Sequence, residues 1–261
     1  MSRAMDALLD LMRRLRDPEQ GCPWDREQTF ASLLRHTLEE AYEVADAVER
    51  QDYPDLAGEL GDLLFQVVFH AQIAAELGHF DFEALATQLH AKLVRRHPHL
   101  FGGAEVADAA AQEAAWERVK ADERAADGKS ASELDGIPLA LPALGRAAKL
   151  QKRASRVGFD WSSAPPVLDK VREELSELSV AMAGGSQQEQ AEELGDLIFA
   201  LVNLARHLRI DPEDAMRAAN AKFERRFRYV ETALARNGRR PAEASLAEMD
   251  ALWDEAKRLG M

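Results

Sequence analysis

An acidic pattern that could bind a metal ion occurs twice in this chain. Each copy pairs Glu-x-x-Glu with a later Glu-x-x-Asp, and the second copy lies 134 positions after the first. The first copy is Glu40, Glu43, Glu59 and Asp62. The second copy is Glu174, Glu177, Glu193 and Asp196. Because oxygen ligands suit Mg²⁺ or Mn²⁺ better than zinc or copper, the repeated quartet predicts a divalent-metal site in each half.

Helical geometry explains why these acids would need a metal ion. Residues three apart lie about 60° apart on one helical face, so each acidic pair forms one edge of its helix. The helix with Glu59 and Asp62 is predicted to be largely buried, because apolar residues occupy most of its circumference: Leu60, Leu63, Leu64, Phe65, Val67 and Val68. Two like charges about 5 Å apart repel by roughly 3 kcal/mol at an effective dielectric of about 20. Shared protons or a divalent cation would relieve that repulsion.

Other interpretations of the acids fit the duplication less well. A di-iron bundle would need a Glu-x-x-His motif, and no His lies three residues after any of these glutamates. Thr37 and Glu40 match a capping box, so Glu40 could instead cap a helix, but the second copy has a valine at the position of Thr37. Glu39 and Glu173 could be solvated surface charges. The duplicated quartet favours the metal site.

Basic residues also recur, and they could hold a phosphate chain. The second half contains Lys222, Arg225 and Arg226. The first half repeats this pattern as Lys92, Arg95 and Arg96. Mg²⁺ usually shares its ligands with substrate phosphates, so the repetition favours phosphate binding over a solvated basic helix face. Trp116 and Trp253 also correspond, and their spacing favours core packing over contact with a base or ribose.

The elements that must position these residues are predicted to be helices. Helix-forming residues dominate, and no run of alternating β-branched residues with hairpin signals is convincing. We expect helices over about 3–16, 28–50, 53–77, 81–97, 108–126, 140–156, 165–183, 187–208, 211–236 and 245–259. The fold class is therefore all-α, with two helical bundles in tandem. The predicted domains are 1–127 and 139–261, and the polar stretch 128–138 is the linker.

Composition limits the classes of function. A net charge of −13 argues against broad nucleic-acid binding, which needs a basic face. The single cysteine, Cys22, excludes an intramolecular disulfide and a cysteine-based zinc site. No apolar run approaches the roughly 18 residues that span a bilayer, and the first residues lack the apolar core of a signal peptide. We expect a cytoplasmic protein without a membrane partner.

The combined motifs resemble the MazG family, two-domain bacterial nucleoside triphosphate pyrophosphohydrolases of the all-α NTP pyrophosphatase superfamily. Beside the acids, the resemblance rests on four motifs across nearly the whole chain: Gly21-Cys-Pro-Trp-Asp25, Arg95-Arg96-His-Pro-His99, Gly158-Phe-Asp-Trp161 and Lys222-Phe-Glu-Arg-Arg226. The resemblance implies Mg²⁺-dependent hydrolysis of NTPs and dNTPs to the monophosphate and pyrophosphate, with broad base tolerance. Mn²⁺ is a possible substitute. The resemblance also implies a homodimer in which helices from both subunits build each bundle.

The resemblance assigns roles to particular residues. It makes the C-terminal repeat the better attested catalytic unit, with Lys222, Arg225, Arg226 and Trp253 around the nucleotide and the four acids on the metal. Glu173 and Glu174 adjoin that cluster and are candidates to take the proton of the attacking water. The turn at 181–190 is rich in Gly and Gln, a departure that puts ligand contacts from this turn in doubt.

Two other functions remain open at this point. A nucleotide sensor or helical partner-binding protein could keep the fold without turnover. A relative of narrow specificity could act on one nucleotide, such as dUTP or phosphoribosyl-ATP.

Overall fold

Helices build the protein throughout its described part. The structure, a computed structural model, describes residues 3–103 and 132–261, together with residues 108, 112, 115, 116, 119 and 123. Among these residues there is no strand, which confirms the predicted all-α class. The chain divides into two compact units, Met1–Asp122 and Glu123–Met261.

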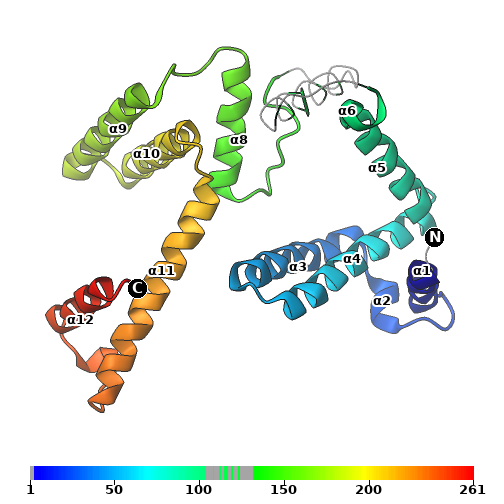
Figure 1. Ribbon diagram of the computed structural model, residues 1–261, viewed down its shortest axis with the longest axis horizontal. Helices are drawn as coiled ribbons and strands as arrows, with labels where there is room; N and C mark the ends of the chain where they lie inside the picture. Colours follow the sequence, from blue (N-terminus) through cyan, green and yellow to red (C-terminus); the bar gives the residue numbers. More distant parts are fainter. Residues whose placement is uncertain are drawn as a thin grey trace. The chain divides into compact units, whose positions relative to one another are not determined.

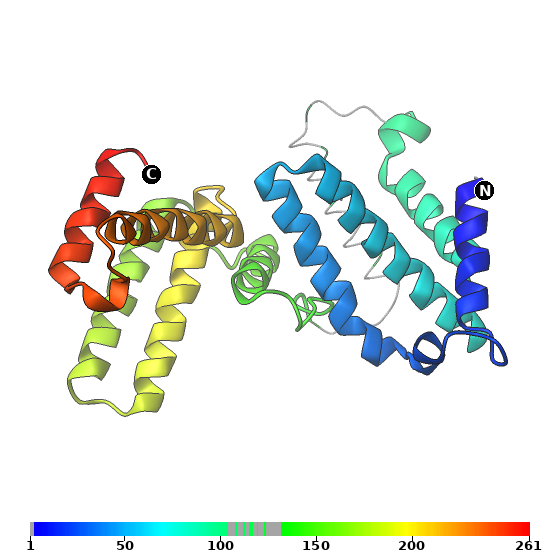
Figure 2. The ribbon, with the colours of Figure 1, turned by 90° about the horizontal axis from the view of Figure 1, so that it is seen from below.

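The first unit is organised around a helical hairpin. Its described helices are α1 (Arg3–Leu15), α2 (Pro23–Glu27), α3 (Phe30–Arg50), α4 (Tyr53–Glu76), α5 (Phe82–Arg96) and α6 (Pro98–Phe101). Helices α3 and α4 run side by side in opposite directions, as Figures 1 and 2 both show. Helices α1 and α5 pack against α4. The hairpin therefore brings the two acidic pairs of the first repeat to neighbouring helices.

The core of this unit lies toward the far end of the hairpin from the α3–α4 turn. Its buried members are Met12, Leu33, Val68, Phe69 and Ile73. Phe69 is fully buried, with 0% of its surface exposed. Removing a buried Phe side chain typically costs about 3–5 kcal/mol, so this residue is a main contributor to the stability of the unit.

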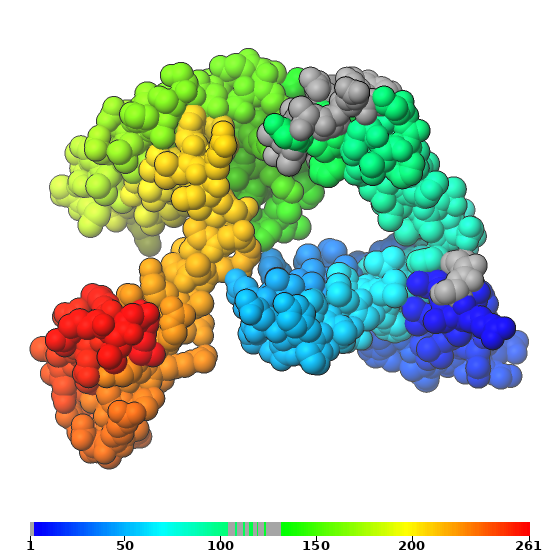
Figure 3. Space-filling model, viewed as in Figure 1, coloured from blue at the N-terminus to red at the C-terminus, as the bar shows by residue number. Residues whose placement is uncertain are grey.

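The second unit repeats the hairpin. Its helices are α8 (Ala143–Arg156), α9 (Ala164–Gly184), α10 (Gln187–His207), α11 (Pro212–Arg236), the short η1 (Pro241–Glu243) and α12 (Leu246–Arg258). Helices α9 and α10 form the hairpin, and α8 packs against both α10 and α11. Helix α12 covers the C-terminal part of α11 (Figure 3, red on orange). The α9–α10 hairpin corresponds to the α3–α4 hairpin of the first unit.

Helix caps fix where the acid-bearing helices begin. Ser186 accepts from the backbone N–H of Glu189, and the Glu189 carboxylate accepts in return from the backbone N–H of Ser186. This capping box starts α10, so that Glu193 and Asp196 fall in its second and third turns. A Cβ at Gly185 would lie 2.8 Å from the backbone oxygen of Ala181, so the tight α9–α10 turn requires glycine there.

The capping interpretation of Glu40 is wrong. Helix α3 begins seven residues before Thr37, with Thr29 as its cap and Ser32 completing the capping box. Thr37 lies inside the helix, and its hydroxyl donates to the backbone oxygen of Leu33 at 3.2 Å. Glu40 therefore has no capping role.

The predicted helices agree with the structure to within about three residues at each end. The short elements α2, α6 and η1 were not predicted, because each begins with a proline, which interrupts a periodic pattern. Most of the helix predicted over 108–126 lies outside the described residues. The same holds for residues 128–131 of the predicted linker, and the domain bounds stay a prediction.

The prediction that the second acidic helix is largely buried is wrong for its first half. Leu60 is 50% exposed and Leu64 is 37% exposed, whereas Val68 and Phe69 farther along α4 are buried. The reason is that the described neighbours of α4 are α3, α1 and α5, and they cover one side of this helix. None of the described helices combines the length and the apolar character that crossing a membrane requires.

Candidate metal site and adjoining pocket

Three glutamates of the second repeat converge on the α9–α10 hairpin. Glu174 and Glu177 come from α9 and Glu193 from α10, and one carboxylate oxygen of each lies within 4.8 Å of the others. Glu174 is buried, Glu193 is half-buried and Glu177 is exposed. Asp196, the fourth predicted ligand, is not part of this group but lines the adjoining pocket together with Glu174. The geometry therefore gathers three of the four predicted ligands directly.

Lys170 is the counter-charge at this cluster. Its ammonium lies 2.8 Å from the buried carboxylate of Glu174 and 2.7 Å from that of Glu173. The hydrogen bonds that Lys170 donates to these two glutamates raise its pKa, so it is fully charged at neutral pH. One positive charge thus faces a cluster of several acids, and the cluster stays net negative.

The remaining negative charge of the cluster affects the pKa of Glu177. A hydrogen bond with Glu174 raises the pKa of the Glu177 carboxyl, and burial and repulsion from Glu174 add to the effect. Lys170 opposes this shift. Neighbouring carboxylates that raise one another's pKa repel when ionised, and a divalent cation would stabilise their ionised form.

The first repeat forms a matching cluster on the α3–α4 hairpin. Carboxylate oxygens of Glu40, Glu43 and Glu59 lie within 4.8 Å of one another. Desolvation raises the pKa of Glu40, and repulsion from Asp62 and Glu43 adds to it. Desolvation and then repulsion from Glu43 likewise raise the pKa of Glu59. Asp62 is outside the group of three but close enough to repel it.

The counter-charge differs between the two clusters. His36 occupies the position of Lys170, 134 residues earlier, and its Nδ1 lies 3.4 Å from the exposed Glu39 carboxylate. The His36 ring also meets Trp24 edge-on, with ring centroids 6.2 Å apart. Among the described residues, the contact that Lys170 makes with the buried carboxylate of Glu174 is therefore specific to the second repeat.

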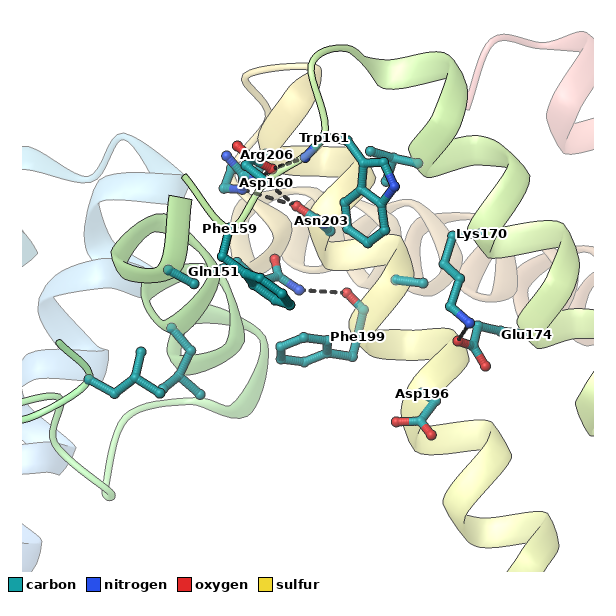
Figure 4. Close-up of a pocket in the computed structure, with 15 residues that line it drawn as sticks. Gln151, Phe159, Asp160, Trp161, Lys170, Glu174, Asp196, Phe199, Asn203 and Arg206 are labelled. Carbon is teal, nitrogen blue, oxygen red and sulfur yellow. Dashed lines mark hydrogen bonds and ion pairs between the residues drawn. The ribbon is translucent and has the colours of Figure 1, made fainter. Parts of the chain in front are cut away.

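A pocket of about 340 Å³ adjoins the second cluster. Figure 4 shows it between α8, α9, α10 and the loop that precedes α9. Phe159, Trp161 and Phe199 supply aromatic walls, while Glu174 and Asp196 line the same pocket. A flat aromatic group could thus bind beside the acids.

A polar network holds the loop that carries Phe159 and Trp161. Asp160 forms an ion pair with Arg206, and Nε2 of His207 lies 3.1 Å from the same carboxylate oxygen. Burial opposes ionisation of Asp160, but the hydrogen bonds from Arg206 and His207 prevail and lower its pKa. Arg206 also donates to the Oδ1 atom of Asn203 at 2.7 and 3.1 Å. The loop is thereby fixed to α10.

The predicted phosphate and nucleotide contacts do not line this pocket. Lys222 and Arg225 are exposed on α11, and the guanidinium of Arg226 lies 5.7 Å from the ring centroid of Trp253. The Nε of Arg226 also donates to the backbone oxygen of Met261 at 2.7 Å. Trp253 contacts Phe223, with ring centroids 5.2 Å apart. Within one chain, α11 and α12 thus hold these residues together.

The corresponding residues of the first repeat lie on and after α5. Lys92 and Arg95 are exposed, and Arg96 is half-buried. Trp116 packs edge-on against His97, with ring centroids 5.1 Å apart, which agrees with a packing role. Roles in phosphate binding stay a prediction for all of these basic residues.

Sequence reasoning missed the polar residues of the pocket, among them Gln151, Lys170, Asn203 and Arg206. A signal for two of them was present. In the alignment by 134 positions, Asn203 corresponds to Phe69 and Arg206 to Gln72, so apolar or neutral residues of one repeat become polar or charged in the other.

Comparisons with known proteins agree with this geometry. A family model described as the MazG nucleotide pyrophosphohydrolase domain matches residues 28–101. A nucleoside triphosphate pyrophosphohydrolase of Escherichia coli K12 is 52% identical over 256 residues, which cover 97% of this chain and 97% of the relative. The chain belongs to the MazG family.

Other comparisons support the MazG assignment across both repeats. The nucleoside triphosphate pyrophosphohydrolase/pyrophosphatase MazG of Thermotoga maritima is 42% identical over 252 residues, covering 97% of this chain and 95% of the relative. The second repeat matches a different family model, that of phosphoribosyl-ATP pyrophosphohydrolase, over residues 150–223. The two matched ranges contain the two acidic clusters, so the resemblance stated from the motifs is confirmed.

Proposed function

We propose that this MazG-family enzyme hydrolyses NTPs and dNTPs of broad base identity to the monophosphate and pyrophosphate, clearing nucleotides from the cytoplasmic pool. The observation that carries the proposal is the cluster of Glu174, Glu177 and Glu193 beside a pocket with aromatic walls. The relatives from E. coli and T. maritima, whose names state nucleoside triphosphate pyrophosphohydrolase activity, support it.

The donor set fits a hard divalent cation. It offers carboxylate oxygens from neighbouring helices, and a single lysine offsets their charge. Mg²⁺, or Mn²⁺ in its place, would be held by Glu174, Glu177 and Glu193, with Asp196 as a fourth ligand. When bound, the ion would neutralise the acids and polarise the phosphoryl oxygens of the substrate. Glu40, Glu43, Glu59 and Asp62 would hold the corresponding ion in the first repeat.

The chain itself would supply the proton acceptor. In the proposed reaction a water oxygen bonds to the α-phosphorus, the bond to the bridging oxygen breaks, and pyrophosphate leaves with that electron pair. The proton of the water passes to Glu173 or Glu174. Glu173 is the better placed of the two, because its carboxylate is 56% exposed whereas that of Glu174 is buried among the ligands.

Basic residues would hold the phosphate chain and the leaving group. Lys222, Arg225 and Arg226 are proposed to do this for the second repeat, with Trp253 beside them. Lys92, Arg95 and Arg96 are their counterparts in the first repeat. Since the pocket lining of one chain does not include these residues, a second copy of the chain is the proposed source of their contact with the substrate.

A homodimer is therefore part of the proposal. Large apolar side chains are exposed on the hairpin of the second unit, among them Leu175, Leu194, Ile198 and Leu201, at 43–53% exposure. Leu60 and Leu64 are exposed at the corresponding face of α4. Exposed apolar faces of this kind mark interaction sites, and pairing of two hairpins would bury them. Light scattering on the purified protein tests this, and a monomer at micromolar concentration would contradict it.

The reaction is tested by product identification. Purified protein with Mg²⁺ and each NTP should release the monophosphate and pyrophosphate. Release of the diphosphate and orthophosphate would refute attack at the α-phosphorus. Tight nucleotide binding with no product would favour the non-catalytic sensor instead.

A second candidate substrate has one observation in its favour. The match of residues 150–223 to the phosphoribosyl-ATP pyrophosphohydrolase model makes phosphoribosyl-ATP a necessary member of the substrate panel. A kcat/KM for phosphoribosyl-ATP far above that for every NTP would replace the broad specificity proposed above with a narrow one.

A further inference from the structure

Two buried amide side chains in the pocket present hydrogen-bonding atoms of fixed type. Gln151, on α8, is 7% exposed, and its Nε2 donates to the backbone oxygen of Phe199 at 2.8 Å (Figure 4). A carbonyl can only accept, so this bond fixes which end of the amide faces Phe199. The Oε1 atom of Gln151 is left buried without a hydrogen-bond partner.

Asn203, on α10, is fixed in the opposite sense. It is 6% exposed, and its Oδ1 atom accepts two hydrogen bonds from Arg206. Arginine can only donate, so Oδ1 must face Arg206. Both of its hydrogen bonds with described residues use Oδ1, so the Nδ2 donor, which is not fully buried, is open to a ligand.

An unpartnered buried polar atom such as Oε1 of Gln151 is unfavourable and uncommon in folded proteins. A ligand that satisfied both amides would therefore gain specificity as well as affinity. The same pocket has the aromatic side chains Phe159 and Trp161 in its walls and the acids Glu174 and Asp196 in its lining. A flat heteroaromatic ring attached to a phosphate chain fits this combination of surfaces.

We infer that Gln151 and Asn203 bind the edge of the substrate's nucleobase in this pocket, Gln151 as hydrogen-bond acceptor and Asn203 as donor. The inference rests on the proposed function, because it assigns the base of the same triphosphate substrate. Each common base carries a donor beside an acceptor on its pairing edge, so one amide pair serves several bases. A ring that lacks the donor leaves Gln151 unsatisfied.

The test compares ATP with purine riboside 5′-triphosphate, which has the same ring without the amino group. We expect the kcat/KM of the wild-type protein for the analogue to be about 10- to 100-fold lower than for ATP, as for loss of one buried hydrogen bond. In Gln151→Leu the ratio of kcat/KM for ATP to kcat/KM for the analogue should fall to near one. The matched control is Gln66→Leu, another buried glutamine with an unpartnered Oε1, on α4, which should keep the wild-type ratio.

A second variant keeps the inference testable if Gln151→Leu does not fold. Asn203→Asp has nearly the same shape and still accepts from Arg206, but it replaces the free donor by an acceptor. Two acceptors fit the adjacent N1–H and N2–H donors of guanine, so the GTP-to-ATP ratio of kcat/KM should rise about tenfold or more. A purely structural role for Asn203 would not change this ratio.

The outcomes separate the inference from the proposed function. If the wild-type protein releases no monophosphate and pyrophosphate from any triphosphate, the proposed function fails. If it does, but the wild type accepts the analogue as well as ATP or Asn203→Asp keeps the wild-type GTP-to-ATP ratio, only this inference fails. A third outcome would also overturn the inference. If Trp253→Ala no longer discriminated between ATP and the analogue while Gln151→Leu still did, the base would be placed at Trp253.

Discussion

In the first unit Phe69 and Ile73 lie on one face of α4 and are buried in the core, whereas the corresponding residues of α10 are Asn203 and His207. The acids about two to three turns before Phe69 and Asn203 are the same in both helices. At α4 the face beyond the acids is filled by apolar side chains. At α10 it borders the pocket, and its polar residues hold the loop that closes one side of it.

The two hairpins therefore share the acidic cluster but differ in what lies beyond it on the second helix. Glu40, Glu43 and Glu59 are as close together as their counterparts. Trp24, however, packs edge-on against Phe69, with ring centroids 6.5 Å apart, and Arg16 lies over the same ring. On the proposed function, we therefore expect turnover at the second repeat and metal binding at both clusters.

The largest expected effect is on activity. Glu193→Gln removes a proposed metal ligand of the second cluster. It should lower kcat by at least about 100-fold, because even residues that hydrogen-bond to metal ligands typically contribute about 10- to 100-fold. Glu59→Gln, its counterpart, should leave most of the activity. Steady-state release of pyrophosphate measures both. Equal losses in the two variants would break the comparison.

The second-largest expected effect is on stability, and it should differ between the buried face of α4 and the pocket-bordering face of α10. Phe69→Ala should lower the free energy of unfolding by about 3–5 kcal/mol, since it empties a fully buried site. Asn203→Ala should cost clearly less, because its side chain borders a pocket and its main partner, Arg206, keeps Asp160. Urea denaturation provides the values. A larger cost for Asn203→Ala would show that α10 is packed as tightly as α4.

Lys170 should matter most when no metal is bound. Lys170→Met removes the positive charge beside Glu174, so the melting temperature in EDTA should fall by several degrees. Saturating Mg²⁺ should restore most of the loss, since the cation would replace the missing charge. His36→Met is the matched control and should respond less to Mg²⁺. A loss that Mg²⁺ does not reduce would mean that Lys170 has another role.

The smallest effect concerns pH. The hydrogen bond with Glu174, together with burial and repulsion, raises the pKa of Glu177 above its ordinary value of 4.5. Because the folded state holds this proton more tightly, ionisation of Glu177 destabilises the metal-free fold, and stability returns as the pH falls through the raised pKa. Glu177→Gln should therefore melt higher than the wild type at pH 7 in EDTA.

The difference between Glu177→Gln and the wild type should disappear below about pH 4.5, where the carboxyl is protonated in both states. Thermal melts of the two proteins across this range provide the check. A variant that is less stable than the wild type at neutral pH would contradict the raised pKa.

The long helices and the acidic clusters could be predicted from the sequence because their signals are periodic and repeated. Four acids at one offset identify Glu174 and Glu193 as neighbours in space before any coordinates are known. Helix ends follow from residues such as Asp52 and Ser186, whose side chains cap the first turn. Local chemistry was sufficient for these features.

The pocket could not be predicted, because it depends on which faces of separate helices meet. Gln151 lies on α8, far in sequence from Phe199, and nothing in its surroundings along the chain marks it. The burial of α4 was overestimated for a related reason, since apolar residues such as Leu60 can face a second subunit as well as a core. Periodicity shows that a face is apolar and not what covers it.

Titration of Mn²⁺ followed by calorimetry, in the presence of a non-hydrolysable triphosphate, tests the central claim most directly. The wild-type protein should bind metal at both clusters, Glu193→Gln should lose the binding that supports turnover, and Glu59→Gln should lose the other. Absence of Mn²⁺ binding in the wild-type protein, or identical titrations in all three proteins, would contradict the account.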